Sequence, residues 1–334
     1  MTKMSEKQCL FTTFVAAIEL LGKPGVTMTS TRSGKHTWAV VLAGGDGTRL
    51  KEMTHQITGD WRPKQFCRFF EGKSLLNHTR ERIAPIFDED RTLFALARAH
   101  EPFYRDQLPE VHDRRKVAQP ANRGTAVAMA LCLEIIARQD ENALVAFFPS
   151  DHHYSNCEAF RESVESGLSM MEEYPQSILI VGAEARYPEV EYGWIEPGRT
   201  LVDSLVNPLL RVSRFWEKPT VRDAKGLHRR ACLWNTFVTI GFAGAFLELL
   251  QATVPHLTRR LGGDPDIDRL YNKIAPVDFS KEVLTRMPER LVVMRDSASG
   301  WTDLGSPSRV VEVLSRHGEW PFATDRLIVP HAHP

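Results

Sequence analysis

A cluster of glycines follows a short apolar run, and two basic residues come after it. The residues concerned are Trp38 to Ala43 for the apolar run, then Gly44, Gly45 and Gly47, then Arg49 and Lys64. A turn built from glycines leaves backbone N–H groups unshielded, and such groups hold phosphates. A planar guanidinium and a mobile ammonium suit the oxygens of a triphosphate. The stretch therefore predicts a phosphate-binding loop.

A carboxylate follows a second apolar run. Ala143 to Phe148 is typical of a buried strand, Pro149 ends it, and Asp151 comes next but one. A carboxylate beside a phosphate site is where a hard cation would bind, because Mg²⁺ prefers oxygen ligands and keeps water and substrate phosphates as the others. His152 and His153 could suggest a transition metal, but no third ligand lies at helical spacing. We therefore interpret His152 as a contact of the substrate or of a metal-binding residue, and His153 as a surface residue.

Two familiar glycine motifs do not fit the first loop. A P-loop needs Gly-Lys followed by Ser or Thr, which is absent. A dinucleotide-binding loop needs a small residue three places after Gly47, where Leu50 stands. A turn that only closes a βα unit stays open as the structural alternative.

The elements that must position these residues alternate along the chain between strand-like and helix-like patterns. The predicted strands are Trp38 to Ala43, Thr92 to Ala97, Ala143 to Phe148 and Ser177 to Gly182. A helix is predicted from the shared face of Phe160, Val164, Leu168 and Met171, with Ser155 or Asn156 as its cap. This alternation predicts an α/β domain with a mainly parallel sheet, in which ligands bind beyond the carboxyl ends of the strands.

A series of motifs resembles the nucleoside-triphosphate:sugar-1-phosphate nucleotidyltransferases, and most closely the mannose-1-phosphate guanylyltransferases. The motifs are LAGGDGTRL, PKQF, QPANRGTAVA, PSDH, YGWIEPG, FWEKP, LWNTF and GWTDLGS, in the family's order from Leu42 to Ser306. The resemblance implies a Rossmann-like (GT-A-like) nucleotidyltransferase fold, with a mainly parallel mixed sheet flanked by helices. It also implies that a sugar 1-phosphate attacks a nucleoside triphosphate and releases pyrophosphate.

The resemblance assigns roles by position. The implied nucleotide contacts are Leu42, Ala43, Gly44, Gly45, Gly47, Thr48, Arg49, Lys64, Gln119, Arg123 and Thr125. The implied sugar-phosphate contacts are His152, Gly193, Glu196, Glu217, Lys218 and Asn235. Asp303 matches the family's second metal-binding aspartate, so Asp151 and Asp303 would share the Mg²⁺ cofactor. These two aspartates, Arg49 and Lys64 would then be the catalytic residues.

Several positions depart from the family pattern and leave the substrates open. Lys51 to Met53 stand in place of a Trp-Pro-Leu-Ser run, Gly124 replaces Asn, and Phe237 replaces Gly. GTP and mannose 1-phosphate are the expected pair, with another base or sugar as the alternative. A non-catalytic nucleotide-sugar-binding regulator is the second alternative. A glycosyltransferase would need a D-x-D pair, which Ser150 and Asp151 do not supply.

Composition limits the remaining classes. The 334 residues carry a formal net charge of +0, so no basic excess points to nucleic acid. Five scattered cysteines without a C-x-x-C pair fit a reducing cytoplasm.

Residues 1–36 are expected to be an extension, with an amphipathic helix from Cys9 to Leu21 and a polar linker, and neither a signal peptide nor a membrane anchor. Residues 37–334 would form the transferase domain, with a nucleotide half (about 37–176) and a sugar half (about 177–318). Homo-oligomerisation is left open.

Overall fold

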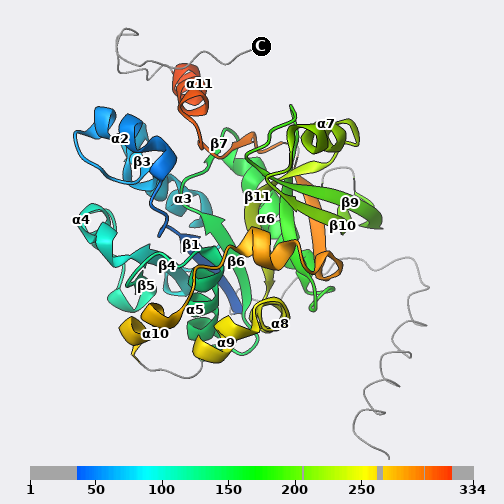
Figure 1. The fold of residues 1–334 in the computed structure, drawn as a ribbon, viewed down its shortest axis with the longest axis horizontal. Coiled ribbons are helices and arrows are strands. Elements are labelled where there is room, and N and C mark those ends of the chain that lie inside the picture. The colour runs from blue at the N-terminus through cyan, green and yellow to red at the C-terminus, as the bar shows by residue number, and fades with distance from the viewer. Residues whose placement is uncertain (1–35, 205–206, 262–265, 297, 318–334) are drawn as a thin grey trace, which may run out of the picture. The chain divides into compact units, whose positions relative to one another are not determined.

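The structure is a computed structural model in which residues 36–204, 207–261, 266–296 and 298–317 are described. These residues belong to one compact unit (Figure 1). The predicted N-terminal helix and most of its linker lie outside the described residues.

A nine-stranded mixed sheet runs through this unit, in the order β5-β4-β1-β6-β11-β8-β12-β10-β9. The strands are β1 (Thr37–Leu42), β4 (Thr92–Ala97), β5 (Lys116–Gln119), β6 (Leu144–Pro149), β8 (Ile178–Glu184), β9 (Gly193–Val202), β10 (Leu209–Glu217), β11 (Leu233–Phe242) and β12 (Leu291–Asp296). Strands β10 and β11 run antiparallel to their neighbours, and the others share one direction. The predicted α/β fold with a mainly parallel mixed sheet is confirmed.

Strand β1 shows why the apolar runs form this sheet. It pairs in parallel with β4 and β6, with Val41 opposite Phe94 on one side and Phe148 on the other. Its side chains alternate between the faces: Trp38 and Val40 pack into one core, and Ala39 and Val41 into another. A strand buried on both faces needs an uninterrupted apolar sequence. The four strands predicted from sequence are confirmed to within about two residues.

Helices cover both faces of the sheet. One face carries α5 (Thr125–Ala137), α8 (Ala243–Thr253), α9 (Pro255–Leu261) and α10 (Ile267–Lys273), and the other carries α3 (Leu75–Ile83), α4 (Glu101–Tyr104), α6 (Cys157–Met171) and α7 (Val221–Arg229). Helices α5, α8 and α9 pack together (Figure 1). The side chain of Asn156 caps α6 by accepting a hydrogen bond from the N–H of Ala159, as predicted.

A third, smaller core joins segments from the two ends of the unit. Helix α2 (Lys51–Thr58) and helix α11 (Pro307–His317), with the turns before them, contribute Leu50, Met53, Leu304 and Val310 to it. Two short ribbons lie beside it: β2 (Arg68–Phe70) with β3 (Lys73–Ser74), and β7 (His153–Tyr154) with β13 (Trp301–Thr302). The β7–β13 pairing brings the segments after Asp151 and before Asp303 into register.

Gly124 is where helix α5 meets a distant segment. Its backbone has a φ of +84°, and a Cβ there would lie 2.3 Å from the carbonyl oxygen of Val277. That oxygen accepts a hydrogen bond from the N–H of Ala126, and the N–H of Val277 donates to the carbonyl of Arg123. The departure from the family's Asn at this position is therefore required by close backbone packing.

The Gly124→Ala variant is expected to lower the free energy of unfolding by roughly 2–4 kcal/mol. Alanine is strained at a positive φ, and its Cβ would also overpack the space beside Val277. The measurement is the midpoint of urea unfolding. Gly72→Ala is the matched control, because Gly72 also has a positive φ (+65°) but no atom within 4 Å of the added Cβ. Equal losses in the two variants would contradict the packing argument.

Candidate active site

A cavity of about 440 Å³ opens beyond the carboxyl ends of β1, β5 and β6. The predicted site residues that line it are Leu42, Gly44, Gly45, Gly47, Arg49, Gln119, Thr125, Asp151, His152, Gly193, Glu217, Lys218, Asn235 and Asp303. The glycine loop and the residues predicted for the sugar phosphate thus share one cavity. Among the described residues, Asn122, Glu191, Phe237 and Asp278 also line it.

The two aspartates converge, and Lys64 holds both segments. Its ammonium lies 3.2 Å from Oδ2 of Asp151 and donates to the backbone carbonyls of Asp303 (2.8 Å) and Leu304 (3.1 Å). Burial acts to raise the pKa of Asp151, but the charges of Lys64 and His152 outweigh burial, and the pKa is lowered. Asp151 is therefore ionised at neutral pH.

Lys64 has a different position from the one its predicted role requires. Its three N–H donors are occupied by three protein oxygens, its side chain is about one-tenth exposed, and it does not line the cavity. The motif predicts a lysine that contacts triphosphate oxygens directly. In the structure it links the two aspartate segments instead, because a buried ammonium needs acceptors on all sides.

The carboxylate of Asp303 is oriented by several groups. Its Oδ1 accepts hydrogen bonds from the hydroxyl of Tyr192 (2.8 Å) and the N–H of Gly305 (2.9 Å), and lies 2.9 Å from Nε of Arg309. Its Oδ2 has only Nη2 of Arg309, at 3.4 Å, among the described residues. Arg309 also pairs with Glu189 (2.8 Å) and lies over the ring of Tyr192. Oδ1 is thus committed to the protein, while Oδ2 keeps acceptor capacity toward the cavity.

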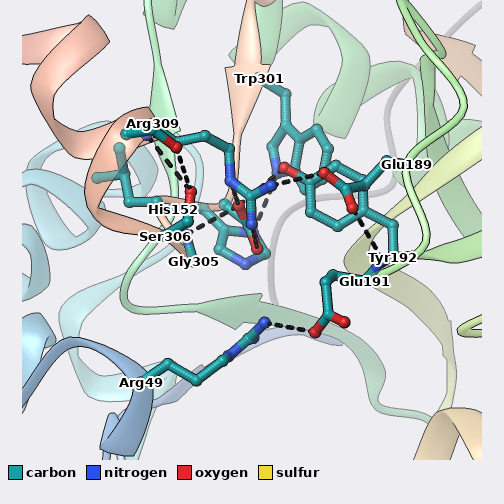
Figure 2. Close-up of polar contacts among 12 residues, drawn as sticks. Arg49, His152, Glu189, Glu191, Tyr192, Trp301, Gly305, Ser306 and Arg309 are labelled. Carbon is teal, nitrogen blue, oxygen red and sulfur yellow. Dashed lines mark hydrogen bonds and ion pairs between the residues drawn. The ribbon is translucent and has the colours of Figure 1, made fainter. Parts of the chain in front are cut away.

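Arg49 reaches across the cavity mouth. Its Nη1 lies 3.1 Å from the carboxylate of Glu191, and both side chains are about half exposed (Figure 2). An exposed pair of this kind contributes about 1 kcal/mol at most. A phosphate that entered the cavity could therefore replace Glu191 as the partner of Arg49 at little cost.

Two of the cavity-lining residues are in the left-handed region of backbone conformation. Phe237 has a φ of 63° and Lys218 a φ of 46°. The N–H of Phe237 donates to Oδ1 of Asn235 (2.8 Å), and the N–H of Lys218 to the carbonyl of Tyr192 (3.2 Å). The position where Phe237 replaces the family's glycine thus keeps the backbone that glycine favours, and its side chain lines the cavity.

Some predicted contacts lie elsewhere. Glu196 does not line the cavity, and its carboxylate binds the indole N–H of Trp216 and Arg230. Side chains alternate along β9, so Glu196 faces the opposite side from Gly193. Arg123 donates to the carbonyl of Tyr271 (3.0 Å) and does not line the cavity either. Ala43 is buried in the core and Thr48 is exposed outside the cavity.

The sequence matches the family model described as nucleotidyl transferase over residues 38–317. The chain belongs to the nucleotidyl transferase family. It is 25% identical to a mannose-1-phosphate guanylyltransferase of Escherichia coli, over 86% of this chain and 64% of that protein. It is 28% identical to the xanthan biosynthesis protein XanB of Xanthomonas campestris, over 84% of this chain and 60% of that protein.

Solved structures support the same family. A structure from Thermus thermophilus, described as a mannose-1-phosphate geranyltransferase, superposes with a TM-score of 0.71 at 29% identity, covering 81% of this chain and 76% of that one. The chain spans less than two thirds of the length of the two relatives from Escherichia coli and Xanthomonas campestris. In the part of the chain that the structure describes, no helix combines the length and apolarity needed to cross a membrane.

Several residues that shape the candidate site were not expected from the sequence. Tyr192 stands inside the YGWIEPG motif, so its position was marked although its bond to Asp303 was not. Glu189, Glu191 and Arg309 belong to no quoted motif. Their roles depend on α11 and the loop before β9 meeting in space, and no periodicity or spacing signals that contact.

The Glu217→Gln variant is expected to gain stability relative to wild type as pH rises. Burial, and then the negative charge of Asp278, raises the pKa of Glu217 from 4.5 to about 7. Between these values the folded state keeps a proton that the unfolded state has released, so the free energy of unfolding falls as pH rises through this range. Glutamine cannot ionise, so the variant lacks this fall. Urea unfolding at about pH 5 and about pH 8 tests it, and a pH-independent difference would contradict it.

Proposed function

We propose that this chain transfers a nucleotidyl group from a nucleoside triphosphate to a sugar 1-phosphate, releasing pyrophosphate and forming a nucleotide sugar. The observation that carries the proposal is the convergence of Asp151 and Asp303, from distant parts of the chain, on one cavity beside a glycine loop. Family membership supports the reaction class.

The charge of the cavity supports a divalent cation. Of the described residues that line it, five are acidic (Asp151, Glu191, Glu217, Asp278 and Asp303), while Arg49 and Lys218 are basic. Two unit charges about 4 Å apart interact by roughly 4 kcal/mol at an effective dielectric near 20, so anionic substrates need a cation to enter. Carboxylate oxygens are the ligands that Mg²⁺ prefers, with substrate phosphates and water completing its shell.

We infer that Asp151 and Oδ2 of Asp303 hold this Mg²⁺, and the arrangement of acceptors fits it. Oδ1 of Asp303 is saturated by protein donors, while Oδ2 retains lone pairs. When bound, the cation would neutralise negative charge on the phosphates of both substrates.

The side chains of the cavity have separate tasks in this proposal. Backbone N–H groups of the glycine loop hold the triphosphate, and Arg49 leaves Glu191 to bind its oxygens. Lys218 binds the phosphate of the sugar, while Gly193, Glu217 and Asn235 receive the sugar ring. The attacking phosphate oxygen is already ionised, so no side chain has to remove a proton. Positioning and charge stabilisation carry the rate.

GTP and mannose 1-phosphate are the proposed substrates, because relatives named for that sugar phosphate are among the most similar proteins. Gly124 and Phe237 line the cavity where the family pattern differs, so they are the residues to examine if another base or sugar is used. Pyrophosphate release with a panel of triphosphates and sugar 1-phosphates tests the proposal. No release with any pair would favour the non-catalytic regulator. A cytoplasmic location and homo-oligomer formation stay predictions.

The Asp151→Asn and Asp303→Asn variants are each expected to lower turnover by a factor on the order of a hundred or more, because each removes a charged metal ligand. Pyrophosphate release at saturating substrate measures this. Asp278→Asn is the matched control, since Asp278 lines the same cavity but has no proposed metal contact. Near-wild-type turnover in either of the first two variants would remove the metal assignment.

The Arg309→Met variant is expected to weaken Mg²⁺ affinity by about 10–100-fold, because Arg309 orients a metal-binding carboxylate without touching substrate. A calorimetric titration with Mg²⁺ in the presence of nucleotide measures the affinity directly. Arg309→Lys should recover part of it, since the charge stays while the fork is lost. Arg316→Met, an exposed arginine on the same helix, is the control. Unchanged affinity in Arg309→Met would contradict the positioning role.

A further inference from the structure

A second cavity, of about 320 Å³, lies behind the segment that carries Asp151. Residues of helix α3, strand β7 and the first turn of α6 line it. His152 lines both this cavity and the candidate active site, so residues 151–154 separate the two. Of the site residues predicted from the sequence, His152 alone borders the second cavity.

Arg82 is the buried cation of this second cavity. The residue is 5% exposed, and its guanidinium lies over the rings of Tyr154 (4.5 Å) and Phe160 (5.2 Å). One terminal nitrogen, Nη2, is 3.5 Å from the carbonyl oxygen of His152, which is the limit of a hydrogen bond. The buried Nε has no hydrogen-bond acceptor in the described part of the chain.

The charge of Arg82 is not balanced by a carboxylate among the described residues. Burial lowers the pKa of Arg82, and the Tyr154 hydroxyl and the Cys157 thiol, the thiol also through a hydrogen bond, act in the opposite direction. Glu81 lines the cavity but pairs with Lys73 at 2.9 Å, and Glu71 is exposed. Burying a charge without a partner is costly, and the cation–π contacts with two rings offset only part of that cost. The guanidinium therefore retains a strong attraction for an anion.

We propose that this second cavity binds a small phosphate-bearing anion, with the Arg82 guanidinium as its main ligand. Arg161 also lines the cavity and adds a positive charge, and His78 and His153 line it as well. The first turn of α6 also borders the cavity. The N-terminus of a helix carries a partial positive charge, which favours a bound anion. The volume is at the lower end for small-molecule sites, which suits one phosphate group with a small substituent.

The thiol of Cys157 provides a local measurement. Cys157 is exposed and lines the second cavity, while Cys67, Cys132 and Cys232 are buried. The full chain is alkylated with iodoacetamide, and the rate at Cys157 is measured by peptide mass spectrometry. The rate in inorganic phosphate is compared with the rate in chloride at equal ionic strength. Phosphate at ten times its dissociation constant should slow the reaction about tenfold, because only the ligand-free fraction reacts. Equal rates in phosphate and chloride would overturn the proposal.

Variants show which cavity the phosphate occupies. Arg82→Gln should abolish the protection, and Arg82→Lys should keep part of it, because the charge stays without the fork. Arg80→Gln is the matched control, since Arg80 lies on the same helix but pairs with Glu110 outside this cavity. Arg49→Gln should leave the protection intact. Protection that survives in Arg82→Gln but disappears in Arg49→Gln would place the anion in the active site and overturn the proposal. The readout is binding, so it stands whether or not the chain proves to be a transferase.

Discussion

The ammonium of Lys64 is the contact on which the rest of the site depends. It is buried, and it binds the carboxylate of Asp151 and the backbone carbonyls of Asp303 and Leu304. One cation thus joins the end of β6 to a turn about 150 residues later, and a buried charge of this kind is costly to leave unpaired. The third core, where Leu50 and Leu304 pack together, closes the same junction with apolar contacts. Both contributions therefore hold the two aspartate-bearing segments together.

The carboxylates of the site are held by different partners. Asp303 is held by a tyrosine hydroxyl, a backbone N–H and a guanidinium, and Asp151 by an ammonium. Each bond fixes one oxygen and leaves other lone pairs for a ligand, and beside the Lys64 ammonium the pKa of Asp151 is lowered despite burial. Glu217 is the contrasting case, because burial and Asp278 raise its pKa to about 7. Within one cavity, the surroundings thus lower the pKa of one carboxyl, Asp151, and raise the pKa of another, Glu217.

The two cavities share His152 and are separated by one short segment of chain. The indole N–H of Trp301 donates to Nδ1 of His152 (3.1 Å), while Nη2 of Arg82 approaches the backbone carbonyl oxygen of His152. The segment 151–154 is therefore in contact with ligands on both faces if both proposals hold. Its only regular structure is the two-residue strand β7, so its position depends on side-chain contacts more than on a hydrogen-bonded ladder.

The sequence by itself determined the parts of this protein that are local or periodic. Apolar runs fixed four strands, the 3.6-residue spacing fixed α6 and its Asn156 cap, and the ordered motifs indicated the family and most cavity-lining residues. Tertiary structure alone decided which side chains are free to meet a ligand. The ammonium of Lys64 contacts three protein oxygens, and Glu196 lies on the face of β9 opposite Gly193. Arg309 reaches Asp303 from helix α11. Those outcomes depend on pairings between residues far apart in the chain, and a motif records residue type without recording its partner.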